Sequence, residues 1–332
     1  MTRERIVKEI IGSRGSPKRE SGFAFAPSNI ALCKYWGKRN DLLNLPVNSS
    51  LSVSLGHLGT TTTISRRKGN DEITLNQKKL KADSSFAIRL SRYLDLFRTS
   101  DIPFYKIETA NNFPTAAGLA SSASGYAALV KALNEFWDWT LDGKALSILA
   151  RLGSGSASRS VTNGFVEWHR GHREDGMDSF AEQIPVSWPE LRLAVVTVSE
   201  TVKPIGSTEG MKKTVETSTL YQSWPQKAAQ DIDVIRHAIY HKDFELLGAT
   251  AESNALAMHA TMIDTQPSVL YWLPETVAVF HKIWRLRRNG LFLYFTVDAG
   301  PNVKILFLES DTTRITSEFK RAEIIKPFDQ EE

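Results

Sequence analysis

A run of small and hydroxyl-bearing residues directly before an amphipathic segment constrains this chain more than any other feature. The run reads Pro114-Thr-Ala-Ala-Gly-Leu-Ala-Ser-Ser-Ala-Ser124, and apolar residues follow it at helix-face spacing as far as Trp137. We expect a loop that leads into a helix N-terminus, where free backbone N–H groups and the helix dipole favour a phosphate. Gly118 would let the backbone approach an oxyanion, and the serine hydroxyls could donate to it or reach a metal. An ordinary serine N-cap on a core helix is the alternative.

Two well-known phosphate-binding loops are excluded. The chain has no Gly-x4-Gly-Lys-Ser/Thr run, and no Gly-x-Gly-x-x-Gly follows a predicted strand. The run therefore belongs to a third class of phosphate loop, if it binds phosphate at all.

Size and composition indicate a globular protein with room for two domains. The chain has 332 residues, of which 42% are hydrophobic and 23% are charged, and its formal net charge is +4. So small a basic excess suits an anionic small molecule as well as it suits nucleic acid. The single cysteine, Cys33, excludes an internal disulfide framework and fits a cytoplasmic location. The first twenty residues are expected to form a frayed extension without a signal peptide, and no apolar run is long enough to cross a bilayer.

The hydrophobic pattern predicts strands and helices in each half of the chain, which indicates an α+β protein. A composition break at residues 184–189 separates the expected domains, 1–188 and 189–332. Strands are predicted at residues 49–55, 60–64, 72–75, 164–168, 191–198, 291–297 and 303–308. Helices are predicted at residues 84–98, 124–137, 141–152, 220–257 and 273–288.

Residues 26–39 combine charged side chains with aromatics and a glycine in a way that core packing does not require. Asn29, Lys34, Tyr35 and Lys38 lie in this segment. The cluster could hold an anionic ligand, with the tyrosine supplying a directed hydroxyl. A solvated basic turn is an equally good interpretation.

A second segment, residues 151–159, predicts an anion site more clearly. Its glycines expose backbone donors, Ser154 and Ser156 add hydroxyls on either side of Gly155, and Arg159 could bind a carboxylate or phosphate with two hydrogen bonds. A flexible linker would have a similar glycine-serine core, but linkers seldom end in an arginine that runs into a strand.

Two weaker signals occur in the second half. Ser207, Thr208 and Met211 lie at a hydroxyl-rich helix start, and Asp298 follows an apolar strand in the turn Asp298-Ala-Gly-Pro-Asn302. A carboxylate at a strand end is positioned for general-base or electrostatic work. An ordinary aspartate turn is the alternative.

Taken together, these segments resemble the mevalonate diphosphate decarboxylases of the GHMP kinase superfamily over residues 25–307. The phosphate loop alone indicates the superfamily, whereas three other segments are specific to the decarboxylase branch. These are Lys34-Tyr-Trp-Gly-Lys38, Gly153-Ser-Gly-Ser156 and Asp298-Ala-Gly-Pro-Asn302. Ser158 departs from the family, in which many members have cysteine before the arginine.

The resemblance implies a two-domain fold with an active site in the cleft between the domains. The N-terminal domain would be ribosomal-protein-S5-like, and the C-terminal domain would be a ferredoxin-like α/β sandwich. The family uses ATP and Mg²⁺ to phosphorylate the 3-hydroxyl of mevalonate 5-diphosphate, then releases phosphate and CO2 to give isopentenyl diphosphate. The resemblance also implies a homodimer.

Residue roles carry over from the family by position. Asp298 matches the catalytic carboxylate, Arg159 the arginine that holds the substrate carboxylate, Asn29 its neighbour, and Lys34 a lysine at the reacting centre. The substrate-binding set is Tyr35, Lys38, Ser154, Gly155, Ser156, Arg159, Ser207, Thr208 and Met211. The ATP-binding set is Asn112, Pro114, Ala117, Gly118, Leu119, Ala120, Ser121 and Ser122. The expected metal ligand is Ser122, or the neighbouring Ser121.

Two rival interpretations remain. A sibling enzyme could use mevalonate or its 5-monophosphate and stop at phosphorylation, or decarboxylate that smaller substrate. A basic nucleotide- or RNA-binding protein is the other, although lysine and arginine form no stripe along the chain. No nucleic-acid or membrane partner is expected.

Overall fold

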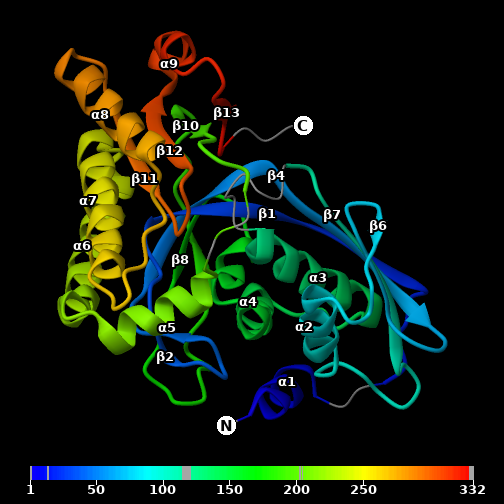
Figure 1. Ribbon diagram of the computed structural model, residues 1–332. Helices are drawn as coiled ribbons and strands as arrows, with labels where there is room; N and C mark the ends of the chain where they lie inside the picture. The colour runs from blue at the N-terminus through cyan, green and yellow to red at the C-terminus, as the bar shows by residue number, and fades with distance from the viewer. Residues whose placement is uncertain (1, 13–14, 114–120, 202, 204, 329–332) are drawn as a thin grey trace.

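The computed structural model describes residues 2–12, 15–113, 121–201, 203 and 205–328, and Figure 1 shows its two sheets and the helices around them. A seven-stranded sheet occupies the N-terminal half and has the order β6-β5-β7-β4-β8-β9, with β1 also paired to β4. Its strands are β1 (Ser21–Cys33), β4 (Ser50–Arg67), β5 (Glu72–Leu75), β6 (Lys78–Lys79), β7 (Phe104–Asn111), β8 (Phe165–Trp168) and β9 (Ala181–Ile184), and a separate ribbon joins β2 (Lys38–Asn40) to β3 (Leu45–Pro46).

Helices cover the N-terminal sheet, and α3 packs directly on β1 and β4. Side-chain caps start three of them: the Thr2 hydroxyl accepts from Arg5 N, the Ser84 hydroxyl accepts from Ala87 N, and the Asp142 carboxylate accepts from Ala145 N. The elements are α1 (Arg3–Ile11), α2 (Ser85–Leu94), α3 (Ser121–Trp137), α4 (Gly143–Gly153) and the 3-10 helix η1 (Gly155–Val161).

The C-terminal half folds as a four-stranded antiparallel sheet of order β11-β12-β10-β13. The chain order β-α-β-β-α-β, with several helices in the first connection, is that of the ferredoxin-like sandwich that we expected. The strands are β10 (Leu191–Val196), β11 (Leu293–Val297), β12 (Val303–Leu308) and β13 (Glu323–Ile325). The helical elements are α5 (Ser207–Thr217), η2 (Leu220–Ser223), α6 (Trp224–His241), α7 (Phe244–Ile263), α8 (Pro274–Arg288), η3 (Glu309–Asp311) and α9 (Thr312–Glu318).

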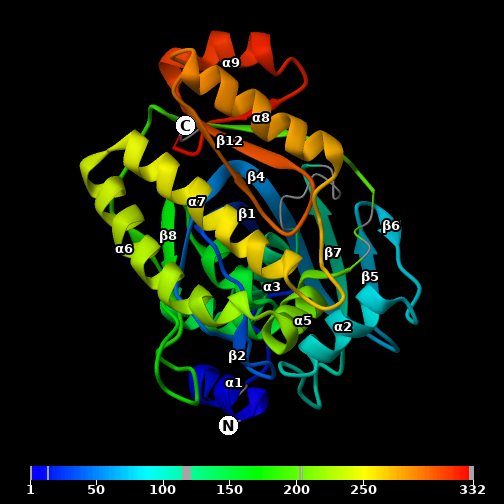
Figure 2. The ribbon, with the colours of Figure 1, turned by 60° about the vertical axis from the view of Figure 1, so that its left-hand side comes forward.

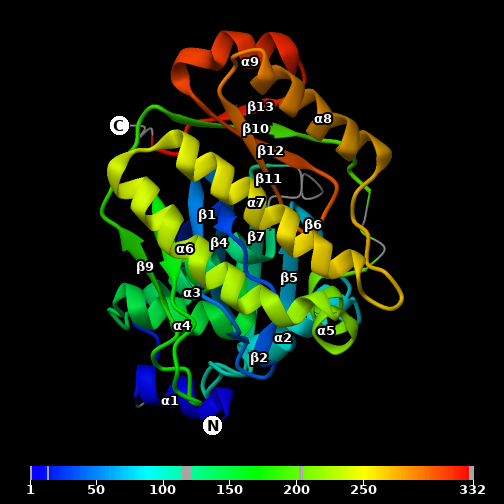
Figure 3. The same cartoon turned by 90° about the vertical axis from the view of Figure 1, so that its left-hand side faces the viewer.

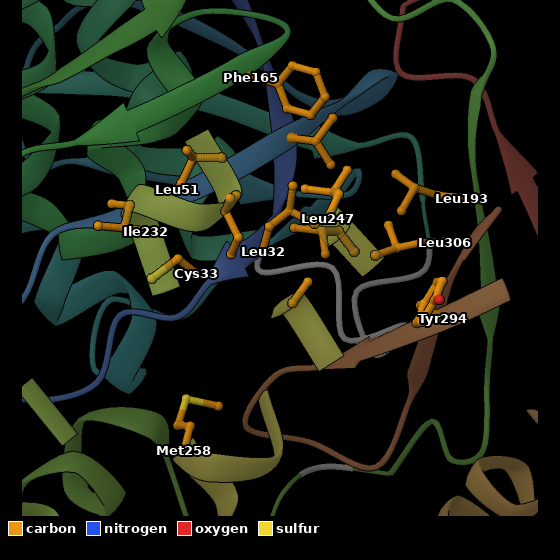
Figure 4. Close-up of a cluster of buried hydrophobic side chains, with 14 of the residues drawn as sticks. Leu32, Cys33, Leu51, Phe165, Leu193, Ile232, Leu247, Met258, Tyr294 and Leu306 are labelled. Carbon is orange, nitrogen blue, oxygen red and sulfur yellow. The ribbon is translucent and has the colours of Figure 1, made fainter. Parts of the chain in front are cut away.

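The two halves share one hydrophobic core. Figure 4 shows Leu32 and Leu51 of the first sheet beside Leu193 and Leu306 of the second, with Leu247 of α7 between them. Figure 3 shows α6 and α7 lying over β1, and both helices contact that strand. Because apolar side chains from both halves are buried together, any site between the halves has rigid walls.

Several sequence predictions need correction. The first residues do not form a frayed extension, because α1 buries Ile6 and Val7 completely. The strands predicted at 49–55 and 60–64 are one strand, β4. The strands β1, β2, β3, β6, β7, β9 and β13 were not predicted. The helical pattern over 220–257 is interrupted at Lys242, whose left-handed backbone (φ 52°) ends α6, and Asp243 then caps α7.

Candidate active site

A cleft of about 360 Å³ lies between the two halves, and segments far apart in the sequence line it. Figure 2 shows the ribbon of two of the elements that contribute, β1 and α5. The end of β1, η1, the start of α5 and the turn after β11 all contribute. Every site residue predicted from the sequence that the structure describes lines this cleft, with the exception of Asn112. Those residues are Asn29, Lys34, Tyr35, Lys38, Ser121, Ser122, Ser154, Gly155, Ser156, Arg159, Ser207, Thr208, Met211 and Asp298.

Asp298 is held between two buried lysines. Lys34 Nζ donates to Asp298 Oδ1 at 2.7 Å, and Lys304 Nζ lies 3.3 Å from Asp298 Oδ2. Each lysine side chain is only 2% exposed, whereas the carboxylate is 31% exposed toward the cleft. Burial alone would raise the pKa of Asp298, but the two ammonium groups outweigh burial and hold that pKa well below its ordinary value. Asp298 is therefore an ionised acceptor of hydrogen bonds at neutral pH.

Helix α7 fixes the backbone on both sides of this ion pair. His259 Nε2 lies 3.1 Å from the Asp298 carbonyl oxygen. Because a carbonyl can only accept, Nε2 carries the proton. Burial lowers the pKa of His259 to about 3, so the imidazole is neutral. One and a half turns earlier on α7, Asn254 Oδ1 accepts from Lys34 N at 2.8 Å.

Arg159 is a buried cation with a free hydrogen-bonding edge. Its Nη1 donates to Ser50 Oγ at 2.6 Å and its Nη2 to Asn29 Oδ1 at 3.4 Å, and the residue is 3% exposed. Within the described ranges no carboxylate pairs with it, and its Nε has no partner. Burial lowers the pKa of Arg159 to about 10, so it remains protonated at neutral pH. A buried guanidinium in this state suits a carboxylate brought by a ligand.

A tyrosine and a lysine stand beside the serine-rich turn of η1. Burial raises the pKa of the Tyr35 hydroxyl, which therefore stays protonated, and it has no partner in the described part of the chain. Lys38 Nζ donates to Asn44 Oδ1 at 2.8 Å. A Cβ on Gly155 would come within 2.8 Å of the Tyr35 oxygen, so only glycine allows this approach. The segment is buried 3-10 helix rather than a flexible linker.

The residue that departs from the family holds this turn in place. Ser158 is fully buried, and its hydroxyl donates to the Gly155 carbonyl at 2.7 Å. Ser147 in turn donates to the Ser158 carbonyl at 3.0 Å. Serine thus supplies a hydrogen bond to the loop from the position at which the resemblance led us to expect cysteine.

The predicted phosphate loop reaches the cleft at its helical end. Ser121 and Ser122 begin α3 and line both the cleft and a second cavity of about 260 Å³ between α2, α3 and the sheet. Pro114, Ala117, Gly118, Leu119 and Ala120 lie outside the described residues. Asn112 lines neither cavity; its amide donates to His57 O and accepts from Gly59 N, which fixes the bend of β4.

Three of the residues around the site were not predicted: Lys203, His259 and Lys304. Lys203 Nζ donates to the Ala299 carbonyl at 2.6 Å and so links the start of α5 to the turn after β11. Lys304 had a signal in the sequence, because it is a charged residue inside the apolar strand β12. His259 and Lys203 had none, since their roles depend on tertiary contacts.

The cleft is strongly cationic. Its described lining carries five cations, Lys34, Lys38, Arg159, Lys203 and Lys304, and one carboxylate, Asp298. Such a lining concentrates polyanionic ligands. No group of three or more His, Cys, Asp or Glu residues that could hold a metal ion occurs in the described ranges. A Mg²⁺ that arrives on a nucleotide and keeps most of its ligands from phosphates and water fits this lining.

Comparison with known proteins agrees with this geometry. Residues 26–181 match the diphosphomevalonate decarboxylase-like N-terminal domain family, and residues 193–330 match the mevalonate 5-diphosphate decarboxylase C-terminal domain family. The diphosphomevalonate decarboxylase mvd1 of Aspergillus fumigatus is 40% identical over 318 residues, which is 89% of this chain and 78% of the relative. The Bos taurus enzyme is 41% identical over 314 residues, with 86% and 76% covered.

Solved structures give the same result. The mevalonate diphosphate decarboxylase from Staphylococcus aureus superposes with a TM-score of 0.87 at 38% identity, over 92% of this chain and 95% of that one. A structure described as MDDEF in complex with MVAPP, AMPPCP and magnesium has a TM-score of 0.85 at 40% identity, over 92% and 97%. The expected two-domain GHMP-kinase fold is thereby confirmed. The chain is an enzyme of the diphosphomevalonate decarboxylase family.

Proposed function

We propose that the protein uses ATP and Mg²⁺ to phosphorylate the 3-hydroxyl of mevalonate 5-diphosphate and then releases phosphate and CO2, leaving isopentenyl diphosphate. The observation that carries the proposal is the cleft with five cations around one ionised carboxylate. A substrate with a diphosphate at one end and a carboxylate at the other matches that charge pattern. The MVAPP and AMPPCP complex of the relative described above supports both ligands.

The arrangement suggests how the substrate lies. Its carboxylate would meet Arg159, whose partners Asn29 and Ser50 hold the guanidinium still. Its diphosphate would meet Tyr35, Lys38 and the serines of η1, with Ser207, Thr208 and Met211 on the opposite wall. The 3-hydroxyl between these two ends would then face Asp298.

Asp298 is suited to orientation rather than to prior deprotonation. An ordinary aspartate has a pKa of roughly 4, far below that of a tertiary alcohol, and the two lysines lower it further. Phosphoryl transfer through a loose transition state needs little activation of the nucleophile. Accepting a hydrogen bond from the 3-hydroxyl therefore suffices to aim its oxygen. Asp298 would accept the hydroxyl proton late, as the new O–P bond forms and the bond to ADP breaks.

The same carboxylate serves the second half of the reaction. When the C3–O bond breaks, both electrons leave with the phosphate and positive charge develops at C3. Asp298 would stabilise that charge electrostatically. The C1–C2 bond then breaks, its electrons form the C2=C3 double bond, and CO2 departs. Arg159 must hold the carboxylate without opposing this departure, and its low exposure keeps water from competing for the guanidinium.

The second cavity supports the proposal that the protein binds ATP. Apolar and threonine side chains of α2, α3 and the sheet line it, and Ser121 and Ser122 connect it to the cleft. An adenosine placed there would direct its phosphates toward Lys34 and Asp298 past the start of α3, where helix N–H groups favour anions. Mg²⁺ would neutralise phosphate charge, and Ser122 stays our predicted protein ligand.

The test offers the purified protein ATP and Mg²⁺ with mevalonate, its 5-monophosphate or its 5-diphosphate, and follows ADP and CO2 together. We expect both products, in equal amounts, from the diphosphate alone. ADP without CO2 would make the protein a kinase. CO2 from the monophosphate would identify a decarboxylase of the smaller substrate. Binding of polyanions that collapses with salt, without turnover, would support the RNA-binding alternative.

Two further expectations belong to the proposal. We place the domain boundary at residues 188/189, between the two sheets. That the protein forms a homodimer stays a prediction. Sedimentation velocity would test it. The described residues contain no helix long and apolar enough to cross a bilayer.

A further inference from the structure

The mechanism above uses both lysines that contact Asp298 to keep its pKa low, but it gives a place in the reaction only to Lys34. Lys34 and Lys304 approach different oxygens of that carboxylate, at 2.7 Å and 3.3 Å. They come from unrelated parts of the chain, the end of β1 and the second residue of β12. Lys304 has no assigned role in the reaction.

Folding alone does not explain a lysine at position 304. Its neighbours on β12, Val303 and Ile305, are fully buried, and the strand lies inside its sheet between β10 and β11. Burying an ammonium is costly unless it is paired. Among the described residues, Lys304 Nζ also donates to the Asn302 carbonyl oxygen, over a long 3.4 Å. The ion pair with Asp298 is therefore its main compensation.

We propose that Lys304 is a positioning residue for the decarboxylase reaction: with Lys34 it clamps both oxygens of Asp298, which fixes the orientation of the carboxylate toward the substrate 3-hydroxyl. The inference rests on the proposed function. It goes beyond it by assigning a positioning role to a second lysine in contact with Asp298.

The clamp has a geometric and an electrostatic consequence. A carboxylate held at one oxygen can still rotate about its Cβ–Cγ bond, whereas one held at both oxygens cannot. The charged groups around it are Lys34 from β1, Lys304 from β12, Arg159 from η1 and Lys203 from the segment before α5. His259 of α7 adds a neutral donor to the Asp298 carbonyl. Removal of Lys304 therefore leaves the carboxylate ionised through Lys34 but free to turn.

The first experiment measures kcat and KM of Lys304→Met. We expect kcat to fall by about tenfold to a hundredfold, the effect of one charge-assisted hydrogen bond realised in the transition state. KM for mevalonate 5-diphosphate should stay within about twofold, because Lys304 holds Asp298 and not the substrate. Arg192→Met is the matched control, since Arg192 is a buried cation on the adjacent strand β10 that pairs with Glu309 outside the cleft. We expect Arg192→Met to lower the stability of the protein and to leave kcat unchanged.

The second experiment asks whether Lys304 acts through Asp298. In the Asp298→Asn background, Lys304→Met should lower kcat by less than a further factor of about two, because the carboxylate that Lys304 positions is absent. In Lys304→Ala, added methylammonium should restore kcat in a saturable way, while tetramethylammonium at equal ionic strength should not. An unchanged kcat in Lys304→Met would overturn the clamp. So would a fall in kcat in the double variant as large as the one that Lys304→Met causes alone, or a failure of methylammonium to restore kcat.

A third measurement needs no turnover, and it uses a variant only to assign the signal. The ¹³C chemical shift of the Asp298 carboxyl, assigned with Asp298→Asn, gives its titration midpoint. With both lysines in place we expect the midpoint below the ordinary value of about 3.9. A midpoint at or above that value in the unaltered protein would overturn the clamp even if the protein makes CO2. Failure to make CO2 would instead contradict the proposed function, so the two failures are distinguishable.

Discussion

Replacing Arg159 by lysine tests the proposed grip on the substrate carboxylate. Arg159 offers a planar fork, already held by Ser50 and Asn29, whereas lysine offers one point charge on a shorter reach. At least one charge-assisted hydrogen bond is lost, worth about 1.5–3 kcal/mol. At about 1.36 kcal/mol per factor of ten, kcat/KM for mevalonate 5-diphosphate should fall about 10- to 150-fold. KM for ATP should stay within about twofold.

The pH dependence of the same variant adds an independent readout. Burial lowers the pKa of Arg159 to about 10, and burial also lowers the pKa of Lys34 nearby. A lysine at position 159 starts from a lower ordinary value, about 10.4, so burial brings its deprotonation closer to neutral pH. The variant should therefore lose further activity as pH rises from 7 to 9, while the unaltered enzyme keeps its Arg159 charge over that range.

The assay is steady-state CO2 release together with inhibition by 3-hydroxy-3-methylbutyl diphosphate, which lacks the carboxylate. The inhibitor should bind the unaltered enzyme and Arg159→Lys equally, because the changed group does not contact it. Arg151→Lys is the matched control: Arg151 is also fully buried, but it bonds backbone carbonyls such as Gly176 O and does not line the cleft. If Arg159→Lys weakened the carboxylate-free inhibitor as much as the substrate, or if it kept normal kcat/KM, the carboxylate grip would be refuted.

Three further predictions follow from the site and its surroundings. Asp298→Asn should lower kcat by at least about a hundredfold while calorimetry still detects substrate binding, and near-normal turnover would remove Asp298 from catalysis. His259, with its pKa lowered to about 3, is neutral when folded and must gain a proton on unfolding below about pH 6.5. It should therefore contribute about 2 kcal/mol to the loss of stability between neutral pH and pH 5. In urea titrations, the free energy of unfolding of His259→Gln should fall less over this pH range than that of the unaltered protein. Burial raises the pKa of the Cys33 thiol, so iodoacetamide should label it only after unfolding, as mass spectrometry can check.

The sequence was sufficient to predict those parts of the site whose residues lie close together in the chain. Residues 34–38 and 153–159 each bring their charged, hydroxyl and glycine members together within one segment, so their chemistry could be inferred before any tertiary contact was known. Lys203, His259 and Lys304 could not be inferred in this way. Each acts on the turn that carries Asp298, from a segment that reaches it only in the folded chain.

The missed strands have a related explanation. Pro27, Ser28 and Asn29 lower the strand propensity of β1, yet pairing with β4 along most of its length overrides that preference, with bulges after Pro27 and Ala31. β2, β3, β6 and β13 are only two or three residues long, too short to show a period. The helical pattern over 220–257 did not reveal that two helices are present. The two segments are each helical, and only one left-handed residue, Lys242, separates them from each other at the end of α6.

The shared core explains why the reacting groups can be held so accurately. Lys34 directly follows Cys33, which is fully buried, and Asp298 lies between Val297 and Ala299, which are also buried. Cys33 and Ala299 belong to the core that joins the two halves. The backbone on either side of the ion pair is therefore fixed by apolar packing, and α7 adds a hydrogen bond to each partner through Asn254 and His259. The carboxylate and the ammonium thus come from different halves of the chain but cannot move apart without opening a close-packed interior, which is costly.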